Sequence, residues 1–353
     1  MARIRKINCC TLRIITFCSC LISFAIDSVV AQAPSQKLYA GVVSLADSIG
    51  GDALAGAGVY VSELSAPTWE PLSWAQSANA AFGIPVRALA MAEAPDLASI
   101  LVGSDDGVLA PLGNFSGWKI LTDWRVRDVL DLFVDPINPQ NVYAATGLGV
   151  AVSQDGGKTW EMSNRGLKET FVSCLASDPL KPGRILAGTE NGVYESIDHA
   201  RTWRTLALEN VAIRSILQQP SSPGVYWLGT EYHGLLASQD GGYVFTPVPL
   251  GQDSLSIYSV AGGNLDEPLL AGSFERGVFM AADDELIWRH LEGSEQLGTI
   301  FSIALADSGR SMYFGTQSRG VWRSTDSGAN WERFGLEGAD VRKLLPATII
   351  LKP

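Results

Sequence analysis

Cysteine and histidine are scarce in this chain of 353 residues, which has five cysteines and three histidines. Four of the cysteines lie in the first 31 residues, so Cys174 is the only one in the remainder. A single cysteine excludes an intramolecular disulfide there, and its apolar surroundings favour a buried, inert thiol. The histidines lack metal-ligand spacing, so we expect no metal site and no cofactor.

Basic residues are also few, with 26 lysines and arginines against 37 aspartates and glutamates. Four of the basic residues and one of the acidic residues lie in residues 1–31, which leaves 22 against 36 and a net charge of −14 in the remainder. Such an acidic surface argues against nucleic acid and anionic membranes as partners.

Residues 1–31 have the pattern of an export signal. A basic start precedes an apolar run from Ile14 to Ile26, which is short for a membrane-spanning helix. Small residues at Val29, Val30 and Ala31 predict cleavage after Ala31, and the alternative is an uncleaved anchor. We therefore expect an exported protein, periplasmic or extracellular, with no stable membrane insertion after cleavage.

A repeat of about 43 residues runs through the rest of the chain. A glycine that opens a short apolar run recurs seven times, and an aromatic residue follows each glycine after eleven residues. Successive glycines are 49, 42, 43, 42, 43 and 43 residues apart. The glycines are Gly58, Gly107, Gly149, Gly192, Gly234, Gly277 and Gly320, and the aromatics are Trp69, Trp118, Trp160, Trp203, Phe245, Trp288 and Trp331.

Each repeat holds four short apolar runs separated by turn residues, without a helical period. Four strands in a unit of this length are typical of a propeller blade. The sequence thus predicts an all-β, seven-bladed β-propeller of four antiparallel strands per blade, as a single domain over residues 35–350. The first repeat lacks an innermost strand, and Val341–Leu345 is similar to the innermost strands of the others. We expect this C-terminal strand to complete the first blade and close the ring.

The segment Ser153–Trp160, SQDGGKTW, reads as a tight turn followed by a large aromatic. It matches the motif Ser-x-Asp-x-Gly-x-Thr-Trp, and weaker copies lie at Ser196–Trp203, Ser238–Phe245 and Ser324–Trp331. On these motifs the chain resembles the BNR/Asp-box propellers, which include sialidases, xyloglucan-cleaving hydrolases, sortilin-type receptors and photosystem II assembly factors. Its length, seven repeats and export signal are most similar to the assembly factors. The resemblance implies the fold and leaves the activity open.

The aspartates of these motifs have a structural interpretation. Each lies in the same turn of its own blade, so the set is too dispersed to converge on one substrate. A carboxylate there can accept hydrogen bonds from the N–H groups of its own turn. We expect turn residues rather than catalytic carboxylates or calcium ligands at Asp155, Asp198, Asp240 and Asp326.

Arginines recur near the start of the innermost strands, which line the channel of a propeller. The second residues of these strands are predicted to be Arg87, Arg127, Ser173, Arg214, Tyr258, Ser302 and Arg342. Four arginines at one level would form a positive focus suited to carboxylate or phosphate. The alternative is that each arginine pairs with an acidic neighbour between blades.

The loops between second and third strands open on the same channel mouth. They carry Glu190, Glu231 and Tyr232, and Trp124 lies between the second and third repeats on that face. The first repeat has a longer loop with an extra segment, Ser44–Ala57, expected to fold over the mouth. Binding residues often lie on such loops of a rigid scaffold.

Two functions are consistent with this pattern. The first is an exported, non-catalytic binding or assembly protein that engages a protein, or an anionic or carbohydrate ligand, at the channel mouth. The second is a glycoside hydrolase, with Tyr258 as nucleophile and Glu231 as acid–base carboxylate of a sialidase-like site. The segment Phe82–Pro85 resembles the sialidase signature Phe-Arg-Ile-Pro but has glycine in place of the arginine. Xyloglucan hydrolases place their cleft between two propellers, whereas this chain has the repeats for one. The sequence therefore favours binding over catalysis.

Overall fold

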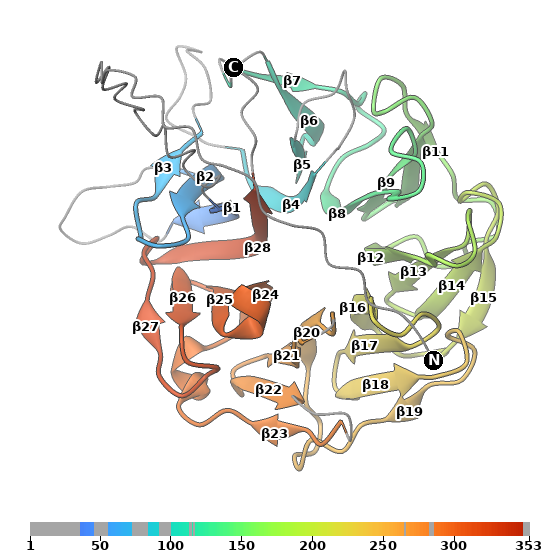
Figure 1. The fold of residues 1–353 in the computed structure, drawn as a ribbon. Helices are drawn as coiled ribbons and strands as arrows, with labels where there is room; N and C mark the ends of the chain where they lie inside the picture. The colour runs from blue at the N-terminus through green and yellow to red at the C-terminus, as the bar shows by residue number, and fades with distance from the viewer. Residues whose placement is uncertain are drawn as a thin grey trace, which may run out of the picture. The chain divides into compact units, whose positions relative to one another are not determined.

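The computed structural model describes residues 36–45, 56–72, 84–91, 100–112, 115, 117–264, 266–281 and 286–348. They form seven sheets of four antiparallel strands, arranged as blades in a ring around a central axis (Figure 1). The predicted seven-bladed β-propeller is confirmed. The expected export signal and most of the long loop of the first repeat lie outside the described residues, so both stay predictions.

Each blade has an innermost strand at the channel and a short outermost strand at the rim. We number the blades from the N-terminus. In order from blade one, the innermost strands are β28 (Ala339–Thr348), β4 (Val86–Met91), β8 (Val129–Val134), β12 (Val172–Ser177), β16 (Ile213–Gln218), β20 (Ile257–Gly262) and β24 (Ile300–Ala306). The outermost are β3 (Glu70–Pro71), β7 (Gly117–Ile120), β11 (Glu161–Met162), β15 (Arg204–Ala207), β19 (Thr246–Pro247), β23 (Arg289–His290) and β27 (Glu332–Arg333).

Most residues of the two middle strands of each blade are buried. The second strands are β1 (Gln36–Leu45), β5 (Ile100–Ser104), β9 (Val142–Thr146), β13 (Ile185–Thr189), β17 (Tyr226–Thr230), β21 (Leu269–Ser273) and β25 (Ser311–Thr316). The third strands are β2 (Gly58–Glu63), β6 (Gly107–Leu112), β10 (Gly149–Ser153), β14 (Gly192–Ser196), β18 (Leu235–Ser238), β22 (Val278–Ala281) and β26 (Val321–Ser324). Every residue of β5, β9, β13, β17, β21 and β25 is buried, which explains their continuous apolar runs.

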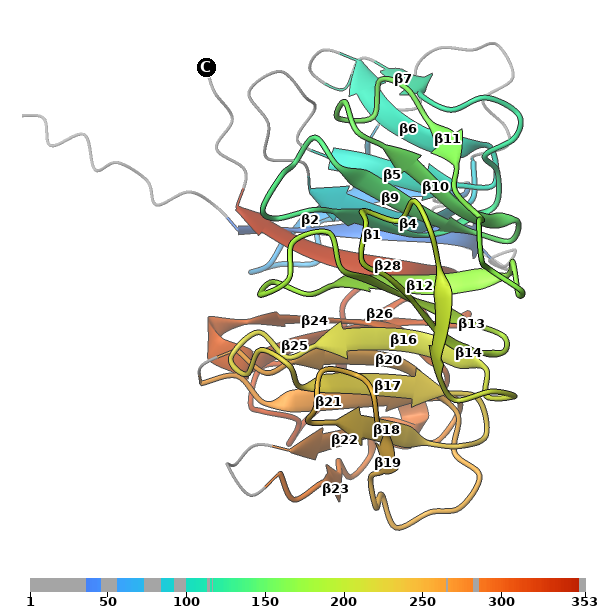
Figure 2. The same cartoon turned by 90° about the vertical axis from the view of Figure 1, so that its right-hand side faces the viewer.

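Helix is nearly absent from this part of the chain. Two 3-10 turns, η1 (Ser294–Leu297) and η2 (Asp307–Gly309), interrupt the loops. Among the described residues, no helix has the length and apolar character needed to span a membrane. Strand pairing and contacts between blades therefore hold the fold together, and Figure 2 shows the strands crossing the ring from one face to the other.

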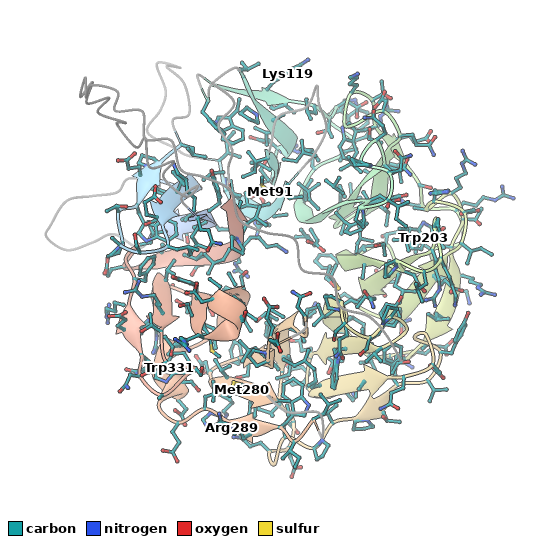
Figure 3. All side chains as sticks on the ribbon, in the orientation of Figure 1. Met91, Lys119, Trp203, Met280, Arg289 and Trp331 are labelled. Atoms are coloured by element: carbon teal, nitrogen blue, oxygen red, sulfur yellow. The ribbon has the colours of Figure 1, made fainter. Side chains whose placement is uncertain are left out.

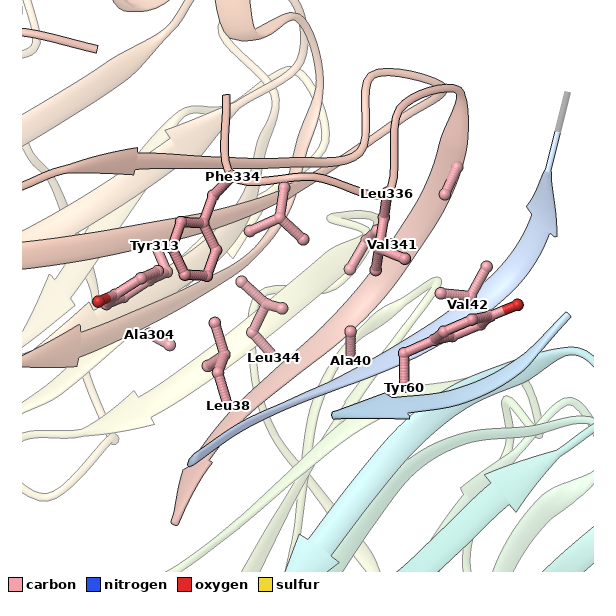
Figure 4. Packing of buried hydrophobic residues seen from close by; sticks show 12 residues of the cluster. Leu38, Ala40, Val42, Tyr60, Ala304, Tyr313, Phe334, Leu336, Val341 and Leu344 are labelled. Carbon is pink, nitrogen blue, oxygen red and sulfur yellow. The ribbon is translucent and has the colours of Figure 1, made fainter. Parts of the chain in front are cut away.

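The ring closes between the two ends of the propeller. The first blade has the strand order β28-β1-β2-β3, so the C-terminal strand is its innermost strand, as predicted. Leu38, Ala40 and Leu344 of this blade share a buried cluster with Tyr313 and Phe334 of blade seven (Figure 4). The pairing of β28 with β1 covers a strand edge that an open ring would expose, and the cluster buries the facing surfaces of the first and seventh blades.

Every junction between neighbouring blades holds an apolar cluster. The described residues form seven such clusters, each built from two adjacent blades. Between blades three and four, for example, Tyr143 and Val150 pack with Leu175 and Tyr194. Apolar burial is thus shared between blades, and each blade depends on its neighbours for stability.

The junctions are closest beside the channel. A Cβ added to Gly103 would lie 2.6 Å from Val129 Cγ1 of the next blade, and one on Gly229 would lie 2.6 Å from the Ile257 carbonyl oxygen. Only a residue without a side chain fits there. Glycine takes this place at Gly41, Gly103, Gly188, Gly229, Gly272 and Gly315. The fully buried β-branched residues at or near the start of the innermost strands are Val86, Val129, Val172, Ile213, Ile257, Ile300 and Val341.

The Ser–Asp turns, at Ser153–Trp160, Ser196–Trp203, Ser238–Phe245 and Ser324–Trp331, share one hydrogen-bond pattern. In the first, Ser153 Oγ donates to Asp155 Oδ1 and accepts from Gly157 N, both at 2.8 Å. Asp155 also accepts from the backbone N–H and the hydroxyl of Thr159, at 2.8 and 2.7 Å. The other three turns repeat the serine bonds and the backbone bond to aspartate. These carboxylates serve their own turns, as predicted.

Three of the repeated tryptophans join neighbouring blades. Their indole N–H groups donate to a carbonyl of the preceding blade: Trp203 to Ser163 at 2.8 Å and Trp331 to Glu292 at 3.0 Å. Trp69 donates across the ring closure, to the Phe334 carbonyl. Figure 3 shows Trp203 and Trp331 in the outer part of the ring, away from the channel. The recurring aromatic is therefore an anchor between blades.

We expect the Ser–Asp turns to make part of the free energy of unfolding sensitive to acid. Burial alone would raise the pKa of Asp155 and Asp198, but hydrogen bonds from threonine and serine neighbours outweigh burial and lower it. A lowered folded-state pKa gives stability that is present above the unfolded value of 3.8 and lost as pH falls through the folded value. An Asp155→Asn/Asp198→Asn variant should have a lower urea midpoint at neutral pH, and the gap to the native protein should narrow between about pH 5 and 3.

Asp253→Asn is the control for this experiment, because Asp253 is exposed and lies outside the turns. Its urea midpoint should follow that of the native protein at every pH. If the double variant kept a constant gap to the native protein across the acid range, the turns would not be the source of the acid sensitivity.

Candidate functional site

The channel mouth lies where the innermost strands begin, and the turns between second and third strands open on the same face. In six blades the second strand ends at a serine or threonine. The hydroxyl of this residue donates a hydrogen bond of 2.7 to 3.0 Å to the carbonyl of a glycine. That glycine is either the first residue of the third strand or the residue just before it. The residue after the serine or threonine therefore has a fixed place at the mouth. These turn residues are Asp105, Gly147, Glu190, Glu231, Phe274 and Gln317.

Each innermost strand has a β-bulge at its mouth end. In blade two, Val86 pairs with Ser104 and Ala88 with Gly103, so Arg87 is the extra residue. The same register shift occurs in all seven blades. A bulge redirects the side chain that it carries. The bulge residues are Arg87, Leu130, Ser173, Arg214, Tyr258, Phe301 and Arg342.

The predicted register of blade three is wrong. The innermost strand starts at Val129, because Asp128 has a left-handed φ of 51° that interrupts the extended backbone. Val126, taken as the start of the strand, is buried in the loop before it. Arg127 therefore lies on that loop, and Leu130 occupies the bulge.

The predicted register of blade seven is also wrong, by one residue. Ile300 pairs with Thr316 and starts the strand, so Phe301 is the bulge residue and not Ser302. Ser302 is buried and its hydroxyl accepts a hydrogen bond from Leu344 N of blade one at 2.9 Å. It joins two blades instead of facing the mouth.

The bulge residue and the turn residue of one blade meet. Arg87 Nε donates to Asp105 Oδ1 at 2.7 Å. Arg214 forms ion pairs with Glu231 of its own blade and with Glu190 of the preceding blade, the latter at 2.6 Å. Two arginines are thus held by carboxylates whose positions the turns fix.

The other two predicted arginines also lie near carboxylates. Arg127 Nη2 is 3.8 Å from Asp106 Oδ1, and Arg342 Nη2 is 4.0 Å from Asp340 Oδ2. Each of the four arginines therefore has an acidic neighbour, but the pairing between blades that the sequence left open holds only in part. Arg87, Arg342 and one contact of Arg214 stay within a blade, whereas the contact of Arg214 with Glu190 joins two blades. Four arginines meet five carboxylates, so they form no positive focus; the carboxylates are Asp105, Asp106, Glu190, Glu231 and Asp340.

Aromatic rings continue the site over blades six and seven. The ring of Tyr258 lies 6.0 Å from that of the turn residue Phe274 and 5.8 Å from that of Phe301, centre to centre. The guanidinium of Arg342 lies 3.6 Å from the centre of the Phe301 ring, a cation–π contact. Three aromatic side chains and one arginine thus form a continuous row over three neighbouring blades.

Tyr258 connects the two parts of the site. Burial raises its pKa, and so do the nearby charge of Glu231 and the proximity of Tyr232, while Arg214 and Arg342 oppose the rise. The structure therefore brings these five predicted site residues together, and Glu190 joins them through Arg214.

Exposed apolar side chains surround this mouth. Tyr232 is 68% exposed on the turn of blade five, and Phe274 is 45% exposed on the turn of blade six. Leu148 and Phe171 are exposed on blades three and four. Trp124 is 81% exposed before β8, and no contact among the described residues joins it to the other candidates.

Sequence analysis missed Phe274 and Phe301. Phe274 directly follows Ser273, the last residue of its second strand, just as Glu231 follows Thr230. Aligning the repeats at this serine or threonine would have identified Phe274 as a turn residue. Phe301 was missed because the strand start was placed one residue late. For both residues, the position within the repeat, and not the type of residue, indicates that the side chain lies at the mouth.

Two further features lie outside this site. Within the described part of the chain, no three histidine, cysteine, aspartate or glutamate residues come together as a metal site. A cavity of about 870 Å³ lies at the opposite face of blades five to seven, with Gln219, Trp227, Met280, Arg289 and Arg310 among its lining. None of the predicted site residues lines it.

Sequence comparison finds no matching protein-family profile and no matching curated protein. Solved structures do match. The GH74 xyloglucanase from Xanthomonas campestris aligns with a TM-score of 0.57 and 18% identity over 70% of this chain and 45% of its own. The extracellular domain of BT4673, a putative hybrid two-component system from B. thetaiotaomicron, aligns at 0.58 and 17% over 76% and 36%. Ycf48 bound to a D1 peptide aligns at 0.55 and 15% over 70% and 81%.

These likenesses establish the propeller fold. The chain spans less than half the length of the xyloglucanase and about a third of the BT4673 chain. The neighbours include both an enzyme and a peptide-bound protein, so the fold alone does not separate the two functions.

Because Arg214 contacts two carboxylates, we expect its replacement to destabilise the protein. Arg214→Gln should lower the free energy of unfolding by about 1–3 kcal/mol, because it leaves Glu190 and Glu231 without their common cation. The control is Arg127→Gln, since Arg127 is 57% exposed and 3.8 Å from its partner. It should change the free energy by less than about 0.5 kcal/mol in urea denaturation.

Replacing all three groups distinguishes repulsion from simple loss of contacts. Arg214→Gln/Glu190→Gln/Glu231→Gln should recover part of the stability lost in the single variant, because no unpaired charge remains. If the Glu190→Gln and Glu231→Gln losses simply added to that of Arg214→Gln, the triple variant would be less stable than Arg214→Gln. That result would contradict the shared ion pair.

Proposed function

We propose that this protein is an exported, non-catalytic binding propeller whose channel mouth holds an extended segment of a partner protein. The observation that carries the proposal is the meeting of bulge and turn residues in blades two, five and six, where Arg87, Arg214 and Tyr258 contact the turns. Side chains fixed in this way lose little conformational freedom on binding. A rigid mouth of this kind suits recognition of a peptide.

Two structural neighbours support the proposal. Ycf48 was solved with a D1 peptide, so a propeller of similar fold binds a segment of protein chain. BT4673 contributes an extracellular domain, and the N-terminal sequence here has the pattern of an export signal. Both relationships fit a binding protein outside the cytoplasm.

The alternative is a glycoside hydrolase, and the geometry of the mouth favours it less. A tyrosine nucleophile is activated by a lowered pKa or by a neighbouring carboxylate base. Burial raises the pKa of Tyr258 and the charge of Glu231 raises it further, while Glu231, the candidate base, is ion-paired with Arg214. Glycoside hydrolases without a tyrosine nucleophile need two carboxyl groups that flank a sugar. Glu190 and Glu231 instead contact the same guanidinium, that of Arg214.

Site-specific photo-crosslinking in the native envelope tests the proposal. A crosslinking amino acid replaces Tyr232 or Phe274, which are exposed at the mouth. We expect a discrete crosslinked partner at both positions. The matched control is Tyr243, which is 47% exposed in the Ser–Asp turn of blade five on the opposite face, and it should give no such product.

Two results would contradict the proposal. One is a partner that crosslinks equally well from Tyr243 and from the mouth positions. The other is release of sugar from xyloglucan or a sialoside by the purified protein, lost in Tyr258→Phe, which would establish the hydrolase instead.

A further inference from the structure

The charges of the mouth identify which kind of segment it fits. Arg214 is shared by Glu190 and Glu231, so this cluster carries one more negative than positive charge. Arg87 is neutralised by its contact with Asp105. A carboxylate or phosphate entering here would meet fixed negative charge, and no arginine of the set lacks an acidic neighbour.

An aromatic shelf lies beside this acidic cluster. We define the shelf as Tyr232, Tyr258, Phe274 and Phe301. Tyr232 and Phe274 present 68% and 45% of their surface to solvent, and both stand on turns fixed by hydroxyl–carbonyl hydrogen bonds. An exposed aromatic surface on a rigid frame marks an interaction site.

The shelf already holds one cation. The guanidinium of Arg342 lies 3.6 Å from the centre of the Phe301 ring, which is close for a cation–π contact. Phe301 in turn contacts Tyr258, and Tyr258 contacts Phe274. The open rings at the far end of this row can receive a second cation in the same way.

We propose that the shelf binds an arginine or lysine side chain of the partner segment, so that the partner is cationic and not anionic. This inference rests on the proposed function, since it names the partner chemistry of the same mouth. The cation would lie over Tyr232 or Phe274, with Glu231 close to the shelf. Aromatic faces and carboxylates together select positive charge, and apolar neighbours of the cation would cover the remaining rings.

Fluorescence anisotropy with short labelled peptides tests the inference on the full chain. The probe is the peptide Gly-Leu-Arg-Trp-Arg-Leu-Gly, compared with versions in which both arginines are lysine, glutamine or glutamate. We expect the arginine peptide to bind at least about tenfold more tightly than the glutamine peptide, with lysine between them. Binding of the glutamate peptide should be undetectable, and added salt should weaken binding of the arginine peptide.

Matched variants locate the effect. Phe274→Ala should weaken the arginine peptide by about three- to thirtyfold, and Glu231→Gln should weaken it severalfold. The controls are Tyr243→Ala, an aromatic of similar exposure on the opposite face, and Glu332→Gln, a carboxylate paired with Arg323 at the rim. Both controls should bind the peptide as the native protein does.

The outcomes separate this inference from the proposed function. If the glutamate peptide binds more tightly and Arg214→Gln or Phe274→Ala abolishes its binding, the mouth is a peptide site but the cationic partner is wrong. If all four peptides bind equally, the cationic partner is wrong. If the control variants lose as much affinity as the mouth variants, both proposals fail.

Discussion

The close approach of neighbouring blades beside the channel is the constraint on which the rest of this structure depends. A valine or isoleucine lies at or near the start of each innermost strand and packs against the second strand of the preceding blade. At six of these seven contacts, the residue on the preceding blade is a glycine because a side chain would not fit. The β-bulge follows one residue later in every blade. The same packing between neighbouring blades is therefore repeated around the ring. It does not depend on the side chain at the bulge, so the bulge residue differs from blade to blade.

The differences lie at two positions per blade, the bulge and the turn after the second strand. Blades five to seven and blade one carry Arg214, Tyr258, Phe301 and Arg342 at the bulge, whereas blades three and four carry Leu130 and Ser173. The aromatic and charged contacts consequently gather on one side of the mouth. A symmetric scaffold in this way presents an asymmetric site, as expected for a fold that hosts many functions.

The repeat could be predicted from the sequence because its glycines and aromatics serve the fold itself. The glycine that opens the third strand accepts a turn hydrogen bond, Trp203 and Trp331 bond to the preceding blade, and Asp155 closes its own turn. The site was predicted only in part. Ser302 was misplaced because the start of its strand was taken one residue late, and Arg127 because left-handed Asp128 delays the start of its strand. Neither shift has a signal in the composition. The carboxylate partner of each arginine depends on distances between turns and strands that sequence spacing does not determine.

Hydrogen–deuterium exchange of the full chain, with and without the arginine peptide, tests the central claim most directly, since it maps where a cationic segment lies on the ring. Binding at the mouth predicts slower amide exchange in the turns at 231–234 and 274–277, with no change in 219–225 and 307–310 on the opposite face. Protection confined to those opposite-face turns, which line the cavity of about 870 Å³, would contradict a binding site at the channel mouth.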